Sequence, residues 1–217
     1  MSFDSGFWSI VTLTLKVSGL AILFSALLGI PVGIWLGLSR GKLKTILRPF
    51  VHTGMALPPV LIGLVLYILL SHSGPLASLG WLFTVQAMIL AQTLLALPFI
   101  VGITMTAVSA IPEEFTQQIQ SLGASPRQIR WTILQEARSG VLLSVAAAFG
   151  RSISEVGAVL IVGGNILGET RVLTTAIVLE TGQGEFGFAL LLGAMLLLLA
   201  LTVNVAILKL YGGRNIV

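Results

Sequence analysis

The sequence predicts an all-α integral membrane protein with five transmembrane helices, and composition is the first observation behind this prediction. Of the 217 residues, 56% are hydrophobic and only 9% are charged, whereas about 25% of the residues of a typical soluble domain are charged. The mean hydropathy of +1.03 agrees with this contrast. These values argue against a soluble enzyme, a disordered chain and a secreted disulfide scaffold. The chain has no cysteine, so disulfides and thiolate metal sites are not expected.

The second observation is the length of the apolar segments. A helix needs about 20 apolar residues to cross a hydrocarbon core about 30 Å thick. The segments that meet this requirement are residues 14–38, 51–70, 83–108, 141–162 and 186–208. Because lipid cannot satisfy open backbone groups and no segment alternates like a barrel strand, we expect these spans to be helices. Together they predict a single transmembrane domain over residues 1–217.

The third observation is the placement of charge. Nine of the twelve Lys and Arg residues fall on one predicted side of the membrane: Arg40, Lys42, Lys44, Arg48, Arg127, Arg130, Arg138, Lys209 and Arg214. The other side has Arg171 with the acids Asp4, Glu169, Glu180 and Glu185. The positive-inside rule therefore predicts an external N-terminus and a cytoplasmic C-terminus, in a multi-pass protein of the cytoplasmic (inner) membrane. The membrane accounts for the basic excess, and no nucleic acid partner is expected.

Two features predict how these helices bend and pack. Pro31, Pro58, Pro59 and Pro98 each remove a backbone donor and are predicted to kink their helices. Small residues also recur every fourth position, which lets helices approach closely. The two stripes are Gly29-Gly33-Gly37 and Ala146-Gly150-Ser154-Ala158. Either packing within the chain, or a self-association seam or pore wall, would explain them.

A short amphipathic helix is predicted in the loop at residues 112–138, on the cytoplasmic side. Glu113 and Glu114 stand where the helix dipole favours negative charge. Phe115, Ile119 and Leu122 follow at helical spacing and form one apolar face. Pro112 suits the first helical position, and Gly123 can end the helix in a left-handed conformation. Ser125 and Pro126 then begin a second helix.

The predicted helix has two interpretations. It is either a connector lying at the membrane interface or a docking helix for a soluble partner. Anionic lipid would repel Glu113 and Glu114, which favours the docking interpretation.

This segment resembles the loop by which ABC-importer permeases insert a coupling helix into a cleft of the ATPase subunit. The pattern of that family is Glu-Ala-Ala, three residues, Gly, nine residues and Ile-x-Leu-Pro. Aligned on Gly123, the tripeptide 117–119 takes the place of Glu-Ala-Ala, and 133–136 takes the place of Ile-x-Leu-Pro. The resemblance implies that the ATPase-coupling residues are Glu113, Glu114, Phe115, Gln117, Gln118, Ile119, Leu122, Gly123, Ala124, Ser125 and Pro126.

The fourth predicted span narrows the resemblance. Residues 150–158, Gly-Arg-Ser-Ile-Ser-Glu-Val-Gly-Ala, resemble permeases for tungstate, molybdate and sulfate, and 162–166 and 170–177 are most similar to the tungstate branch. The resemblance implies the type I ABC importer permease fold and import of an oxyanion. It also implies two cytoplasmic ATPase subunits, which bind ATP and Mg, and an external oxyanion-binding protein. Five helices are few to enclose a pathway, so we expect a homodimer.

Charged residues within the spans are candidates for a role in transport. Arg151 and Glu155 lie four residues apart on one helix face, with Ser154 beside them. A lone charge at a bilayer centre costs at least about 2.5–3.5 kcal/mol, and pairing lowers that cost. The pair either fixes helix packing, or lies at the pore or subunit seam, where Arg151 meets a passing dianion. Lys16, near the outer end of the first span, is expected to snorkel to the interface.

No energy source is recognisable within the chain. Gly41-Lys42 is not a phosphate loop, because Leu36 and Leu43 occupy positions that require Gly and Ser or Thr. His52 and His72 are expected on opposite membrane sides, so no metal site and no bound cofactor are predicted, and no catalytic residue is proposed. The alternative is a proton-coupled secondary anion transporter or channel that uses Glu155. Such proteins usually show repeated halves and several intramembrane ionisable groups, neither of which is visible here.

Overall fold

The computed structural model describes residues 6–39 and 42–209, which fold into helices joined by turns. The charges of Asp4, Arg40 and Arg214 support the predicted orientation, but these three residues lie outside the described residues. In chain order the elements are α1 Gly6–Leu38, α2 Lys42–Met55, α3 Pro59–Leu70, the 3-10 helix η1 Ala77–Leu79, α4 Val85–Ser109, α5 Glu113–Ser121, α6 Pro126–Glu136, α7 Arg138–Ile153, α8 Gly157–Gly163, α9 Leu173–Gly182 and α10 Phe186–Lys209.

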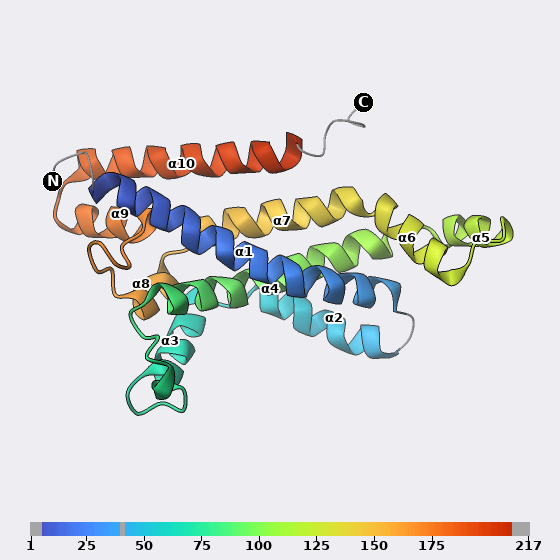
Figure 1. Cartoon of the computed structure of the whole chain (residues 1–217), viewed down its shortest axis with the longest axis horizontal. Coiled ribbons are helices and arrows are strands. Elements are labelled where there is room, and N and C mark those ends of the chain that lie inside the picture. Colours follow the sequence, from blue (N-terminus) through green and yellow to red (C-terminus); the bar gives the residue numbers. More distant parts are fainter. Residues whose placement is uncertain (1–5, 40–41, 210–217) are drawn as a thin grey trace.

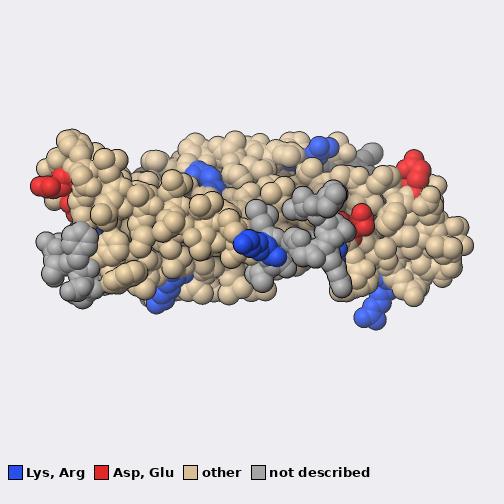
Figure 2. Space-filling view, turned by 90° about the horizontal axis from the view of Figure 1, so that it is seen from above, with Lys and Arg blue, Asp and Glu red and all other residues tan. Residues whose placement is uncertain are grey.

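The molecule is an elongated bundle (Figure 1). The start of α1, α9 and the start of α10 lie together at one end, which we call the N-terminal end. The opposite extremity is formed by α5, and we call it the α5 end. The few charged side chains are separated by wide uncharged surface, and acidic groups lie toward both ends of the face seen in Figure 2.

Within the described residues, α1, α4 and α10 are each long and apolar enough to cross a membrane. The bent pairs α2–α3 and α7–α8 raise the number of crossings to as many as five. The apolar segment before residue 14 is part of α1, which begins at Gly6 and has 33 residues. At 1.5 Å per residue it is about 50 Å long and therefore extends beyond a hydrocarbon core of about 30 Å.

The first glycine stripe packs α1 against α4 within the chain. A Cβ added at Gly33 would lie 2.8 Å from the Val101 carbonyl oxygen, and one at Gly37 would lie 2.6 Å from the Val108 Cβ. Only glycine allows the two backbones to come this close. Contacts advance in the same direction along both helices, so α1 and α4 are parallel.

The neighbours of α4 run the opposite way. In α2, Gly54 lies against Pro98, and Val51, three residues earlier, lies against Gly102, four residues later in α4. In α7, contacts to α4 likewise advance in opposite directions, from Gly140 against Ala107 to Ser152 against Gln92. Five alternating crossings require this arrangement, with first and third spans parallel and second and fourth antiparallel to them.

The breaks in both bent pairs lie where α3 packs against α8. The α2–α3 pair bends by 93° just before Pro59, where consecutive prolines deprive the backbone of two donors. The predicted second span is thus two helices, and its basic lead-in is helical from Lys42. The α7–α8 pair bends by 58° without a proline. Pro31 and Pro98, by contrast, lie inside the continuous helices α1 and α4.

Polar side chains join the helices within the apolar core. Gln92 and Ser152 form a reciprocal pair: the Ser152 hydroxyl donates to Gln92 Oε1 at 2.9 Å, and Gln92 Nε2 donates to the Ser152 carbonyl at 3.1 Å. The hydroxyls of Thr104 and Ser144 make a second buried link between α4 and α7 at 3.1 Å. Such hydrogen bonds position helices where apolar contact alone has little directionality.

Candidate functional site

The α5–α6 element at the α5 end is the first candidate site. A helix is present where the sequence predicts one, and Glu113 and Glu114 occupy its first turn. Pro112 holds the N-cap position, one residue earlier than predicted. At the other end Gly123 has φ +82°, as predicted for a helix stop.

Hydrogen bonds fix both sides of the α5–α6 turn. The Gly123 amide donates to the Gln120 carbonyl at 3.0 Å and the Ala124 amide to the Ile119 carbonyl at 3.4 Å, which together make a Schellman motif. Ser125 then caps α6 through a capping box with Gln128, and Pro126 occupies the first turn. The turn therefore holds the two helices in a defined relation.

The predicted apolar face of α5 divides into two parts. Phe115 and Ile119 are half-buried, and Phe115 lines a cavity beside Ala137 and Gly140 of the bundle. Leu122 is 86% exposed and projects from the C-terminal end of α5. Part of the predicted apolar face thus packs against the bundle, and Leu122 is the residue of that face that remains exposed for contact with a partner. Other exposed residues near it are Gln117, Gln118, Ser125 and Pro126, and Ala124 is half-buried.

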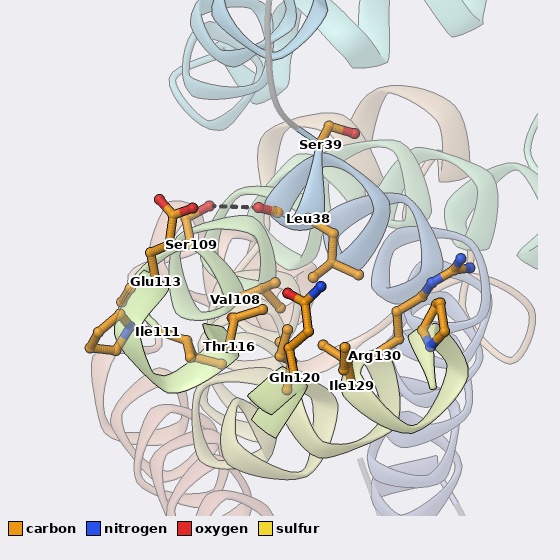
Figure 3. Close-up of a pocket in the computed structure, with 15 residues that line it drawn as sticks. Leu38, Ser39, Val108, Ser109, Ile111, Glu113, Thr116, Gln120, Ile129 and Arg130 are labelled. Carbon is orange, nitrogen blue, oxygen red and sulfur yellow. Dashed lines mark hydrogen bonds between the residues drawn. The ribbon is translucent and has the colours of Figure 1, made fainter. Parts of the chain in front are cut away.

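A cavity of about 690 Å³ separates α5 and α6 from the ends of α1 and α4. Figure 3 shows Gln120 and Arg130 projecting into it from below and Leu38 and Val108 forming the opposite side. At its edge the Ser109 hydroxyl donates to the Gly37 carbonyl at 3.3 Å, which ties α4 to α1. On this side, α5 and α6 therefore stand apart from the ends of α1 and α4.

The second candidate site is the break between α7 and α8, where Arg151 and Glu155 form an ion pair. Arg151 Nη1 donates to Glu155 Oε2 at 3.1 Å, and the side chains are 33% and 4% exposed, respectively. The other carboxylate oxygen accepts from the Ala158 amide at 3.1 Å. The Glu155 carbonyl accepts from the Thr174 hydroxyl at 2.9 Å. Glu155 therefore joins α7, α8 and α9, in addition to pairing with Arg151.

The two breaks lie side by side. A Cβ on Gly157, the first residue of α8, would lie 2.8 Å from Val60 Cγ2 at the start of α3. A Cβ on Gly63 would lie 2.8 Å from the Ala158 Cα. Ser154 is exposed beside the break, and its hydroxyl donates to the Gly150 carbonyl at 2.9 Å. The structure thus brings Arg151, Ser154 and Glu155 together where the α2–α3 and α7–α8 breaks adjoin.

Sequence reasoning missed two residues of this region. Gln92 and Thr174 hold the segment around the break from α4 and α9, and neither belongs to a local motif. An amide in the middle of a predicted span was the one signal that could have identified Gln92. Among the described residues, no group of three or more His, Asp or Glu could hold a metal ion. His52 and His72 are both exposed, in α2 and in the turn after α3.

Known proteins resemble most of the chain. The family described as binding-protein-dependent transport system inner membrane component matches residues 29–211. A probable anion ABC transporter permease protein of Haloferax volcanii is 42% identical over 201 residues, covering 90% of this chain and 87% of that protein. The tungstate uptake system permease protein TupB of Peptoclostridium acidaminophilum is 38% identical over 207 residues, covering 95% and 91%.

A solved structure shows the same fold. The MetNI methionine ABC transporter, in an inward-facing conformation, superposes with a TM-score of 0.72 at 22% identity, covering 94% of this chain and 93% of that one. The fold is that of type I ABC importer permeases. Because the family model matches most of the length of the chain, the chain belongs to the family of inner membrane components of binding-protein-dependent transport systems.

Proposed function

We propose that this chain is the permease subunit of an ABC importer that carries a tetrahedral oxyanion, most closely tungstate, into the cytoplasm. The single observation that carries the proposal is the α5–α6 element: a short helix with an exposed Leu122, held by a capped turn at one end of a bundle of this family. The relatives named above, an anion permease and a tungstate permease, support the substrate class. Molybdate and sulfate share the tetrahedral dianion chemistry.

Two copies of the chain would form the translocation pathway. The centre of one bundle is packed, with Ile100 and Thr104 fully buried, so an ion needs a route beside the bundle rather than through it. The α3 helix packs on α8 along one face and exposes apolar side chains on others, including Val60, Leu64 and Ile68. A second copy facing this surface would place both pairs of helix breaks along a twofold axis.

Two ATPase subunits would dock on residues 113–126 from the cytoplasm, and an external binding protein would meet the N-terminal end. ATP and Mg would bind the ATPase subunits and not this chain. When the ATPases close, they would draw the two α5 helices together. The capped turn at Gly123–Ser125 would transmit that movement to α6 and α7, and the adjoining breaks would absorb it.

Arg151 is our candidate for contact with the passing anion. Its side chain is one-third exposed beside the break, and Glu155 already balances its charge. A neutralised arginine would attract a dianion weakly, which suits a pathway that must release its cargo as readily as it admits it.

Reconstitution tests the proposal. The chain, the candidate ATPase and the binding protein would be placed in liposomes, and ATP hydrolysis and tungstate uptake measured. We expect the ATPase to co-purify with the chain and its hydrolysis to rise with tungstate-loaded binding protein. Tungstate uptake driven by a proton gradient without ATP would contradict the proposal and favour a secondary transporter that uses Glu155.

A further inference from the structure

A cavity at the N-terminal end is lined by two cationic side chains, Lys16 and Arg171. Neither belongs to the α5–α6 element or to the α7–α8 break. The cavity, of about 240 Å³, lies between α1 and the turn that precedes α9. Its lining residues are Ser9, Thr12, Leu13, Lys16, Gly168 and Arg171. We propose that it binds a tetrahedral oxyanion between Lys16 and Arg171. The inference rests on the proposed import of an oxyanion and assigns that anion a first contact on this chain.

Lys16 faces the cavity as a cation with no partner among the described residues. With Ser9 and Thr12 it lies on one face of α1, because positions three and four apart in a helix are neighbours. Its side chain is exposed and makes no ion pair or hydrogen bond with any residue in 6–39 or 42–209. Snorkelling explains why a lysine is tolerated near a span end, but it does not explain why a second cation shares its cavity.

Arg171 is held in place without losing its charge. Its Nε donates to Asn165 Oδ1 at 3.2 Å and its Nη2 donates to the Asn165 carbonyl at 3.3 Å. Asn165 has φ +54°, a left-handed conformation that asparagine tolerates and that turns both acceptors toward the arginine. Asparagine is neutral, and three of the five guanidinium N–H groups remain available for a ligand.

Arg151 and Arg171 therefore differ in how their charges are held. Arg151 is paired with a buried carboxylate, whereas Arg171 is oriented by a neutral amide. No carboxylate is among the residues that line the cavity. Two positive charges with no carboxylate among the described residues that line their cavity repel each other, and an anion between them would relieve that repulsion.

The remaining lining groups fit a ligand that only accepts hydrogen bonds. The Ser9 and Thr12 hydroxyls donate to the α1 backbone, so the donors left for a ligand are Lys16, Arg171 and the Gly168 amide. That amide donates to no acceptor within the described part of the chain. A water molecule takes up about 30 Å³ of liquid, so the cavity admits a five-atom oxyanion with part of its hydration shell.

Equilibrium binding tests the site directly. Tungstate would be titrated into the purified full chain in neutral detergent at low salt, where surface charge is least screened, and followed by calorimetry. Because Lys16 and Arg171 supply charged hydrogen bonds, we expect Lys16→Met and Arg171→Gln each to weaken binding about tenfold or more. Lys16→Arg should bind nearly as wild type. Asn165→Asp should also weaken binding, because it gives Arg171 a carboxylate partner without removing the guanidinium.

Lys209→Met and Arg48→Gln are the matched controls, since both remove an exposed cation elsewhere on the chain. A lipid phosphate offers the same oxyanion chemistry, so phosphatidylglycerol retained by each variant would be measured by native mass spectrometry. Tungstate binding lost in the variants identifies a free anion as the ligand. Loss of retained phosphatidylglycerol in the same variants, without tungstate binding, identifies a lipid headgroup as the source.

Equal binding of both ligands by wild type and variants, or binding of neither by wild type, would overturn the site. So would unchanged ligand binding with weaker docking of the binding protein, which would assign the two cations to a protein contact. These measurements need neither ATPase nor transport. Failure of ATP-driven uptake would therefore count against the proposed function and leave this result standing.

Discussion

Single buried polar residues organise the α7–α8 break. The Glu155 carboxylate is nearly inaccessible, yet one of its oxygens meets Arg151 and the other meets the Ala158 amide. A buried carboxylate is tolerated only when it is paired and hydrogen-bonded in this way. Arg151, being one-third exposed, can still reach water or a ligand on its own. The buried Glu155 therefore needs Arg151 as a partner more than the partly exposed Arg151 needs Glu155.

This asymmetry predicts an order of stability. Arg151→Gln leaves a buried charge unpaired and should lower the free energy of unfolding by about 2–3 kcal/mol. Glu155→Gln keeps an acceptor for Ala158 and leaves a partly exposed arginine, so about 1 kcal/mol is expected. The double variant should be more stable than Arg151→Gln alone. Thermal unfolding in detergent measures this order, and purely additive losses would contradict the coupling.

The same double variant separates packing from transport. If Arg151 touches the passing anion, Arg151→Gln/Glu155→Gln should fold and yet transport little, while Arg151→Lys keeps part of the activity. Tungstate uptake in proteoliposomes, compared at equal protein levels, is the measurement. Uptake by the double variant close to wild type would show that the pair serves only the helix break.

At the scale of elements, the turn from α5 to α6 is set by residues within a few positions of one another. Gly123 takes the left-handed conformation, and Ser125 with Gln128 closes a capping box. Because these interactions are local, the sequence predicted both the helix end and the new start. The apolar face of α5 was less predictable, since Phe115 is partly covered by the bundle.

Leu122→Asp should uncouple the importer. The side chain is 86% exposed, so the fold should tolerate the change. Burying a leucine side chain in a partner contributes about 1.5–3 kcal/mol, and replacing it with a charge should weaken ATPase association by at least tenfold. Affinity capture of the ATPase and tungstate uptake would both be measured. Leu122→Met, which keeps an apolar side chain, is the control, and normal association of Leu122→Asp would show that the interface lies elsewhere.

At the scale of the whole molecule, helix directions agree with five alternating crossings. The α1 and α4 helices are parallel, and α2 and α7 run against them. Positive charge gathers toward the α5 end through residues such as Arg127, Arg130 and Arg138. The predicted orientation, with that end in the cytoplasm, stays a prediction.

The absence of native cysteine makes the orientation testable. Ser121→Cys at the α5 end and Gln183→Cys after α9 both place a thiol at an exposed position. In right-side-out vesicles a membrane-impermeant maleimide should label the second variant, and should label the first only after the membrane is opened. The reverse pattern would mean that the chain is inserted the other way.

The sequence by itself determined the class of the molecule, the approximate spans and the α5–α6 turn. Apolar runs, charge asymmetry and helix caps act over short stretches, so they can be read without knowing what packs against them. The α9 helix was not predicted, and its first amide donates to the hydroxyl of Thr14, 159 positions away. Likewise, Gln92 and Ser152 join segments distant in sequence through hydrogen bonds, and one cavity is lined by Lys16 and Arg171 together. Only the tertiary structure decided these, because the energy of a buried polar contact depends on which helices meet there.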